Sequence, residues 1–413
     1  MKHGLKLAGT TVVLFMSSGL ASATDGYFQH GYGVKAQGIG GVGIALPQDG
    51  LAAATNPAGS ALVGDRLDAG LTWFAPKRDA DITAPNPTAG HYDGNGKKNF
   101  FIPEFGYTRQ VSERLGVGLA VYGNGGMNTR YQSGIPLFGK GEAGVNLEQV
   151  FISPSIAWKA NEHNAFGAAL NFAYQRFEAK GLQNFDPGFT VSPGNVTNRG
   201  VDSATGWGLR LGWTGQVTPD LTLGATWSSK IKPGKFDKYE GLFADGGSFD
   251  IPENFGIGLA YKLTPSLTVA ADAERIKYGS VKAVSLPLAN IVNGLGASNG
   301  AGFGWKDVSV LKIGASYAYA QDLTLRVGYN HSGQPIRASQ TLFNILAPAV
   351  VQDHLSAGAT WTLAKGDELS IAYTHAFNKT IKGSGSIPPG FGGGEANIQM
   401  KENLLGVAYG WKF

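Results

Sequence analysis

Alternation of apolar and polar residues is the main pattern along this chain. From about residue 66 to the C-terminus, apolar side chains occupy every second position over spans of about ten residues, for example in 115–121, 166–174 and 355–363. The positions between them hold Gly, Ala, Ser, Thr, Asn and scattered charges. A period of two is that of a β-strand whose two faces meet different surroundings. The pattern therefore predicts an all-β protein.

The links between these strands alternate in length without exception. The short links are 110–115, 158–164, 216–221, 262–267, 318–323 and 362–369, and the long links are 78–99, 125–146, 179–202, 230–249, 278–305, 332–350 and 379–397. Counting the strands between links gives fourteen. Short turns at one end and long loops at the other are typical of outer-membrane barrels, whereas a soluble sandwich or propeller needs no such asymmetry. We expect residues 66–413 to form a fourteen-stranded antiparallel transmembrane β-barrel in a bacterial outer membrane.

Both termini fit an exported protein. Lys2 and Lys6 flank the start of an apolar stretch, 7–20, and Ala21-Ser22-Ala23 is a small-x-small cleavage site. This layout is typical of a secretory signal peptide, residues 1–23, with an uncleaved anchor helix as the alternative. The last strand ends on Phe413, and an aromatic last residue is typical of the signal read by the barrel assembly machinery.

Composition narrows the function classes. Charged residues are 15% of the chain, below the roughly 25% of soluble domains, yet no apolar run reaches the length of a membrane helix. Without Lys2 and Lys6 the formal charge falls from +4 to +2, so nothing suggests a nucleic-acid partner. There is no G-x-S-x-G, H-E-x-x-H or P-loop pattern, and we expect neither enzyme activity nor a cofactor nor a metal. The adjacent His331 and Ser332 leave an outer-membrane lipid hydrolase open as an alternative.

The segment 24–65 precedes the first strand and is predicted to plug the barrel. A fourteen-stranded barrel has a lumen too wide for its own side chains to fill, and this segment is the spare piece of the mature chain. It is rich in Gly and Ala, which suits close packing. Asn56 is a good helix N-cap and Pro57 suits the first helical position, so a short helical turn should begin there.

This combination resembles the FadL/TodX family of outer-membrane transporters. The residues that carry the resemblance are 38–45, Asp49, 52–55 and the tripeptide Asn56-Pro57-Ala58, followed by the alternating pattern and the terminal Phe. The resemblance covers essentially the whole mature chain. It implies a passive, ligand-gated channel for long-chain fatty acids or monoaromatic hydrocarbons, with 24–65 as a hatch inside the barrel and the Asn-Pro-Ala turn at its core.

The resemblance also implies a route. Family members take ligand from an apolar external groove into a lumenal pocket and release it sideways through a gap beside a kinked third strand. In this chain the kink is expected at Gly123, Asn124, Gly125 and Gly126, because Gly weakens strand pairing. The implied partners are the hydrophobic ligand, outer-membrane lipid and lipopolysaccharide, and we expect a monomer.

Charges on the inward faces suggest where a polar headgroup binds. By parity these are Glu104, Arg210, Lys262, Asp272, Glu274, Lys312 and Arg326. They form either a network of ion pairs or, at Arg210, Lys312 or Arg326, a partner for a substrate carboxylate, because cationic side chains bind such groups through charge-assisted hydrogen bonds.

The long loops are unusually apolar for surfaces that face water. The groove candidates are Leu137, Phe138, Phe236, Leu242, Phe243, Leu342 and Phe343. Exposed patches of this kind mark binding sites or interfaces, so these residues either capture ligand or pack on one another. The family places its groove in the third and fourth loops, but the third loop here, 179–202, is polar, with scattered apolar residues such as Phe185, Phe189 and Val191. A general diffusion porin would need a wet, charged mouth and stays as the other alternative.

Overall fold

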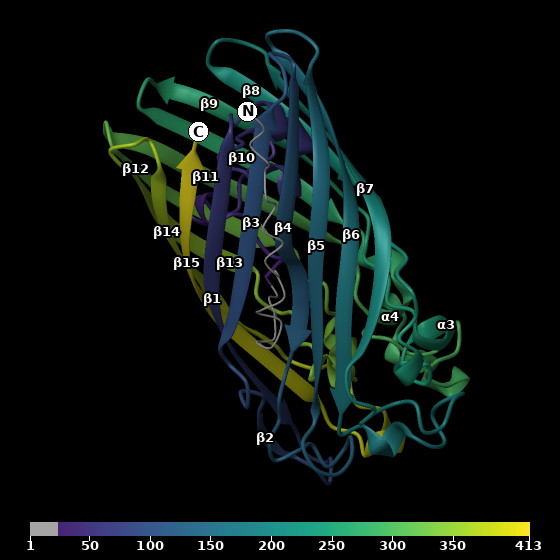
Figure 1. The fold of residues 1–413 in the computed structure, drawn as a ribbon. Coiled ribbons are helices and arrows are strands. Elements are labelled where there is room, and N and C mark those ends of the chain that lie inside the picture. The colour runs from purple at the N-terminus through teal and green to yellow at the C-terminus, as the bar shows by residue number, and fades with distance from the viewer. Residues whose placement is uncertain (1–23) are drawn as a thin grey trace, which may run out of the picture.

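The chain folds into a closed barrel of fourteen antiparallel strands (Figure 1). The computed structural model describes residues 24–413, so the predicted signal peptide, 1–23, lies outside the described residues. The barrel strands are β1 (Arg66–Ile82), β3 (Phe100–Gln110), β4 (Leu115–Asn128), β5 (Gly144–Lys159), β6 (Asn164–Lys180), β7 (Asp202–Gln216), β8 (Leu221–Ser228), β9 (Asn254–Thr264), β10 (Leu267–Ile276), β11 (Val308–Ala320), β12 (Leu323–Ser332), β13 (Asp353–Thr362), β14 (Glu368–Ile381) and β15 (Ala396–Lys412). Neighbours in sequence pair with one another, and β15 pairs with β1 to close the barrel. The predicted strand number and order are confirmed.

The alternation of the sequence becomes the two faces of the barrel. Apolar side chains point outward, where Ile257 is 65% exposed and Trp207 is 59% exposed. The inward faces carry polar residues that bond across strands, such as the Thr360 and Ser370 hydroxyls at 2.8 Å. An apolar belt outside and hydrogen-bonded groups inside suit a barrel surrounded by lipid, because lipid offers no partners to polar groups.

The two ends of the barrel differ as the link lengths predict. Short turns and the C-terminus lie at the top of Figure 1, and the long loops lie at the bottom. The first long loop contains β2 (Gly90–Asp93), an extra strand that pairs with β1 and was not predicted. The other loops carry short helices: η2 (Gln183–Phe185), η3 (Asp237–Tyr239), α3 (Ala244–Gly247), η4 (Tyr278–Ser280), α4 (Lys282–Ser285), η5 (Leu288–Asn293), η6 (Ala338–Gln340), α5 (Thr341–Asn344) and η7 (Pro389–Phe391). None of the helices within 24–413 is long and apolar enough to cross a membrane.

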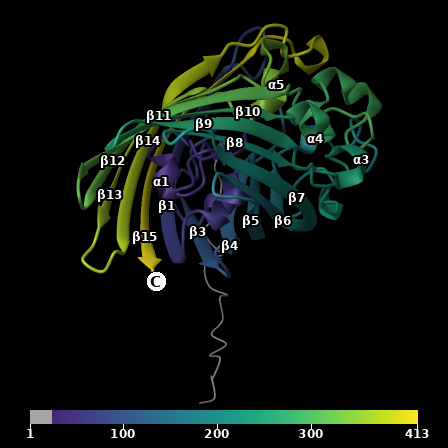
Figure 2. The same cartoon turned by 90° about the horizontal axis from the view of Figure 1, so that it is seen from above.

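The segment 24–65, here called the hatch, lies inside the barrel (Figure 2). Its elements are α1 (Val34–Gln37), α2 (Ala52–Thr55) and η1 (Pro57–Ala61). The helical turn predicted at Asn56 is present: its side chain accepts a hydrogen bond from the Ala58 N–H at 3.1 Å and donates to the Trp213 carbonyl at 2.9 Å. The barrel wall comes this close because residue 212 is Gly, where a Cβ would lie 1.9 Å from the Asn56 oxygen.

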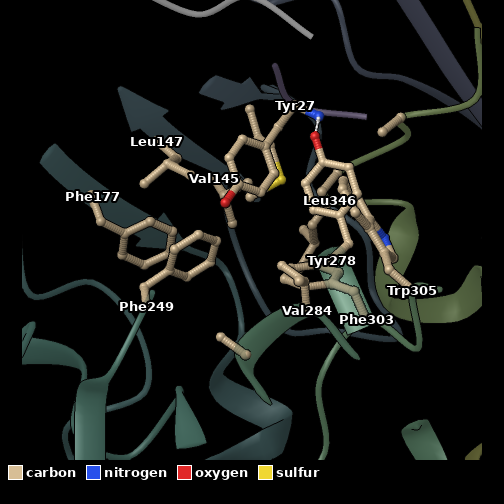
Figure 3. Packing of buried hydrophobic residues seen from close by; sticks show 14 of the residues in the cluster. Tyr27, Val145, Leu147, Phe177, Phe249, Tyr278, Val284, Phe303, Trp305 and Leu346 are labelled. Atoms are coloured by element: carbon tan, nitrogen blue, oxygen red, sulfur yellow. Dashed lines mark hydrogen bonds between the residues drawn. The ribbon is translucent and has the colours of Figure 1, made fainter. Parts of the chain in front are cut away.

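The rest of the lumen is filled by apolar side chains from the long loops. They join one large cluster with residues of β4 to β6 and with the start of the hatch, and many of its members are aromatic (Figure 3). The hatch therefore fills the short-turn half of the lumen, and the loops fill the half toward the long-loop end.

Candidate functional site

An apolar pocket opens among the long loops. Its lining residues are Val145, Phe177, Leu182, Phe185, Leu242, Phe243, Ala283, Leu295, Ala301, Gly302, Phe303, Phe343 and Leu346. No charged side chain is among them. Pairs of rings meet edge to face, such as Phe177 with Phe243 at 4.7 Å between centroids. Such walls favour an uncharged apolar or aromatic guest.

The structure sorts the predicted groove residues into two groups. Leu242, Phe243 and Phe343 line the pocket. The other four do not: Phe138, Phe236 and Leu342 are fully buried between loops, and Leu137 is half-buried against the same cluster. The pocket draws on the third to sixth loops, because Leu182 and Phe185 of the third loop line it together with residues of the fourth, fifth and sixth.

Sequence reasoning missed Phe177 and Phe303. Phe177 belongs to β6, and its odd number places it on the inward face, which otherwise holds Ala, Gly, Asn and Gln. An aromatic ring at an inward position was a usable signal. Phe303 follows a Gly-rich run in the fifth loop and has no periodic pattern that would have singled it out.

Carboxylates on the barrel wall hold the hatch by its backbone. Two of the predicted inward charges have this role: Glu104 on β3 accepts from the Gly33 and Val34 N–H groups at 3.1 and 2.9 Å, and Asp272 on β10 accepts from Gly43 and Ile44 at 2.8 and 3.1 Å. Asp68 on β1 accepts from the Gly50 N–H at 2.8 Å and pairs with Arg66 at 2.7 Å. These hydrogen bonds are directional, so they fix the position of the hatch.

The three predicted cations divide between two places. Arg210 and Lys312 line one polar cavity next to the hatch. Lys312 is neutralised by Glu274, 2.8 Å away, whereas Arg210 forms no ion pair within residues 24–413 and its Nε has no hydrogen-bond partner there. Arg210 is 4% exposed and donates to the Thr55 carbonyl at 3.0 Å.

The third cation lies outside this cavity. Arg326 donates to Gln48 at 2.8 Å and to Thr360 at 2.7 Å. Lys262, also inward by parity, is exposed near the short-turn end of β9. Of the three cations, Arg210 is therefore the one that lines the cavity without an ion pair among the described residues.

The third barrel strand, β4, is irregular at the four predicted positions. The register with β5 shifts between Gly123 and Gly125, so Asn124 is an extra, bulged residue. On the other side, the ladder with β3 ends at the pair Phe105 and Val121. Among the described residues, no ladder joins the rest of β4 to β3, and the barrel wall is interrupted there.

The start of the hatch bonds to this irregular stretch from inside the barrel. Phe28 forms an isolated bridge with Gly125, and the Gly126 N–H donates to the Tyr27 carbonyl at 2.9 Å. A Cβ at residue 125 would lie 1.9 Å from that carbonyl, so this approach requires Gly. Arg78, which sequence reasoning missed, spans the outer end of the interruption by donating to the Asn128 carbonyl at 3.0 Å.

The adjacent His331 and Ser332 do not form a catalytic pair. They lie on opposite faces of β12: His331 bonds the exposed Asp353 at 2.7 Å, whereas the Ser332 side chain is buried. Nucleophile and base must lie within hydrogen-bonding distance. Among residues 24–413, no group of three or more His, Asp or Glu side chains is arranged to hold a metal ion.

Comparisons with known proteins agree with this architecture. The family model described as outer membrane protein transport protein (OMPP1/FadL/TodX) matches residues 20–413. An outer membrane protein of Neisseria meningitidis serogroup B is 27% identical over 114 residues, which is 26% of this chain and 24% of the length of that relative.

Solved structures share the fold. The toluene transporter TodX of Pseudomonas putida has a TM-score of 0.68 at 18% identity, over 93% of this chain and 99% of that chain. A FadL homologue of Pseudomonas aeruginosa has a TM-score of 0.71 at 16% identity, over 94% and 100%. The Ralstonia pickettii toluene transporter TbuX has a TM-score of 0.64 at 19% identity, over 93% and 99%. The barrel, the hatch inside it and the match across the chain lead to one conclusion: this protein belongs to the OMPP1/FadL/TodX family of outer-membrane proteins, which transport hydrophobic compounds.

Proposed function

We propose that this protein is a passive, ligand-gated channel that takes hydrophobic molecules from outside the cell into the outer membrane. The observation that carries the proposal is the apolar pocket at the long-loop end, joined to the start of the hatch by one continuous apolar cluster. A guest would enter the pocket, displace the start of the hatch and leave sideways where the ladder between β3 and β4 stops.

The pocket supports capture of uncharged ligand. Burying apolar surface contributes about 25 cal/mol per Å², and the five Phe rings of the lining offer edges and faces to an aromatic guest. TodX and TbuX are named toluene transporters, and a monoaromatic hydrocarbon suits these walls. Arg210 adds a second class, because its free donors would meet the carboxylate of a fatty acid that reaches the polar cavity.

Sideways release follows from the physics of the cargo. A hydrophobic molecule that crossed into the periplasm would have to be solvated by water, whereas a molecule that leaves through the wall stays in an apolar medium. The bulge at Asn124 and the end of the ladder at Val121 support an exit there. The hatch, anchored to the wall at Asn56, Glu104 and Asp272, argues against a general diffusion porin, because it fills the path an ion would take.

The test is uptake by cells that lack their own transporter of this kind. Phe343→Ala should raise the half-saturating toluene concentration about tenfold, because the pocket loses one aromatic wall. Phe189→Ala is the matched control, since Phe189 packs on Phe185 and Phe391 but does not line the pocket. Equal toluene uptake by both variants and the parent would contradict capture in this pocket.

A further inference from the structure

We infer that Tyr278 is the positioning residue that couples the external pocket to the irregular part of β4, by holding residues 25–28 of the hatch in place. The inference rests on the proposed function for its ligand and adds the residue through which the ligand would act. Tyr278 lies in the fifth long loop, is fully buried and does not line the pocket.

The Tyr278 hydroxyl bonds to the hatch backbone with its whole capacity. It accepts hydrogen bonds from the N–H groups of Tyr27 and Phe28 at 3.1 and 3.2 Å, and it donates to the Asp25 carbonyl at 2.6 Å (Figure 3 shows the contact with Tyr27). A phenol has one proton to donate and two lone pairs to accept with, so all three are used. A Cβ at residue 26 would lie 2.5 Å from the Tyr278 ring, and the Gly there allows the ring to approach.

The same short segment bonds to β4 on its other side. The Tyr27 carbonyl accepts from the Gly126 N–H at 2.9 Å, and Phe28 bridges Gly125. Residues 25–28 therefore lie between the Tyr278 hydroxyl and the part of β4 that pairs with β5 but not with β3. If the hydroxyl moves, two buried N–H groups lose their partner, which costs free energy. This cost favours release of the segment from β4 as well.

Two series of rings connect this point with the pocket. Phe303 lines the pocket and packs on Trp305 at 6.4 Å, and Trp305 meets Tyr278 edge to face at 5.2 Å. Figure 3 shows Phe303, Trp305, Tyr278 and Tyr27 grouped together.

The second series starts on the other side of the pocket. Phe243 lines it and packs on Phe249 at 5.0 Å, and Phe249 lies 6.0 Å from Tyr27. Both series end at the contact between Tyr27 and Tyr278, whose rings are 5.0 Å apart. A guest that displaces Phe303 or Phe243 would therefore disturb the Tyr278 hydroxyl, whose hydrogen bonds hold the backbone of residues 25–28.

Labelling of a single cysteine tests this coupling, because the chain has no Cys of its own. Phe28→Cys in the full-length protein in liposomes places a thiol at a side chain that is 5% exposed, and its reaction with a soluble maleimide measures release of the segment. We expect slow labelling that toluene accelerates. Adding Tyr278→Phe should raise the rate without toluene about tenfold, through loss of the hydroxyl's bonds, and remove the response to toluene.

Tyr131→Phe is the matched control. Its hydroxyl is also buried and donates to the Ile345 carbonyl of the sixth loop at 2.7 Å, without contact with the hatch, so labelling should stay slow and responsive to toluene. If Tyr278→Phe labels at the parent rate, or still responds to toluene as the parent does, the inference is wrong.

Toluene uptake by the parent separates this inference from the proposed function. If the parent takes up toluene but labelling does not depend on Tyr278, the coupling is wrong and the proposed channel function stands. If the parent does not take up toluene, but both the resting labelling rate and its response to toluene depend on Tyr278, the proposed channel function is wrong and the coupling stands.

Discussion

The two halves of the lumen are filled by different interactions. In the short-turn half, the hatch is held by directional hydrogen bonds that its backbone donates to Glu104 and Asp272 and that its Asn56 side chain donates to the Trp213 carbonyl. In the long-loop half, aromatic and aliphatic side chains pack without charges around the pocket. Directional bonds specify one position, whereas apolar packing is non-directional and can form again around a guest. We therefore expect the short-turn half to stay in place and the long-loop half to rearrange when a guest binds.

This comparison changes the role of the Asn-Pro-Ala turn. The resemblance implies a ligand-gated channel with Asn56 at the core of the hatch, yet the Asn56 amide donates to the Ile44 and Trp213 carbonyls at 2.7 and 2.9 Å and lies against Gly212. We propose that this turn is the fixed point of the hatch and that residues 25–28 are the part that moves.

The largest expected effect comes from removing the fixed half altogether. Deletion of residues 24–65, with the export signal kept, should convert a closed barrel into an open pore, because loop packing alone does not fill the short-turn half. Single-channel conductance in planar bilayers measures this, with the full chain and the thermal melting of both barrels as controls. A deletion variant that folds and stays closed would contradict this division of the lumen, since the loops would then seal it alone.

The next effect concerns the boundary between the halves, at the bulge of β4. Deleting Asn124 removes the extra residue, so β4 can continue in register with β5 and extend its ladder with β3. Toluene uptake should fall to the level of cells without the protein. Deletion of Gly390, which is exposed in the seventh loop and where an added Cβ would meet nothing within 4 Å, is the control for removing one residue. Undiminished uptake by the Asn124 deletion would contradict an exit through this part of the wall.

The fold was largely predictable because it depends on repeating features. Alternation defines the faces of each strand, and link lengths define the two ends. The pocket was not predictable in the same way, because loop residues have no period that fixes their direction. Leu342 and Phe343 are adjacent and both apolar, yet Leu342 is fully buried and Phe343 lines the pocket. The packing of one loop against another determines which of two adjacent apolar side chains is buried and which lines the pocket.

Inward charges show the same limit. Parity places Arg210, Lys312 and Arg326 on inward faces, and all three are found there. Parity does not show which groups lie opposite each of these cations. The hydrogen bond between Arg326 and Gln48 and the ion pair between Lys312 and Glu274 therefore became visible only in the folded chain.

A smaller and more selective effect is expected at Arg210. Arg210→Gln removes the unpaired cation from the polar cavity, and uptake of oleate should fall about tenfold, because hydrogen bonds to charged groups contribute roughly 1.5–3 kcal/mol. Toluene uptake should be unchanged, since toluene has no carboxylate. Arg326→Gln is the matched control, as Arg326 already bonds Gln48 and Thr360 outside the cavity. Equal loss of both substrates in Arg210→Gln would indicate a structural role for the residue.

The smallest effect concerns a polar contact at the outer edge of the loop half. Glu142 accepts from Arg130 at 2.7 Å and from Lys180 at 3.3 Å. Burial raises the pKa of Glu142, but the hydrogen bonds from Arg130 and Lys180 outweigh it and hold the pKa below its ordinary value of 4.5. A carboxyl with a lowered pKa stabilises the folded state above its ordinary pKa, and this contribution is lost as the pH falls through the lowered value. Because the three side chains are 26%, 45% and 41% exposed, we expect less than about 1 kcal/mol.

Amide hydrogen exchange would measure that contribution where Tyr131 and Ala143 pair beside Glu142. Protection in the parent should exceed that in Glu142→Gln at pH 6 by a few fold, and the two should converge as the pH falls through the lowered pKa of Glu142. Glu113→Gln, in the short turn after β3 at the opposite end, should match the parent throughout. The small size of this stability contribution is informative. If the Glu142 contacts contributed as much as the apolar packing beneath them, the long-loop half would be held by directional bonds, as the hatch is. It would then not be the half that rearranges around a guest.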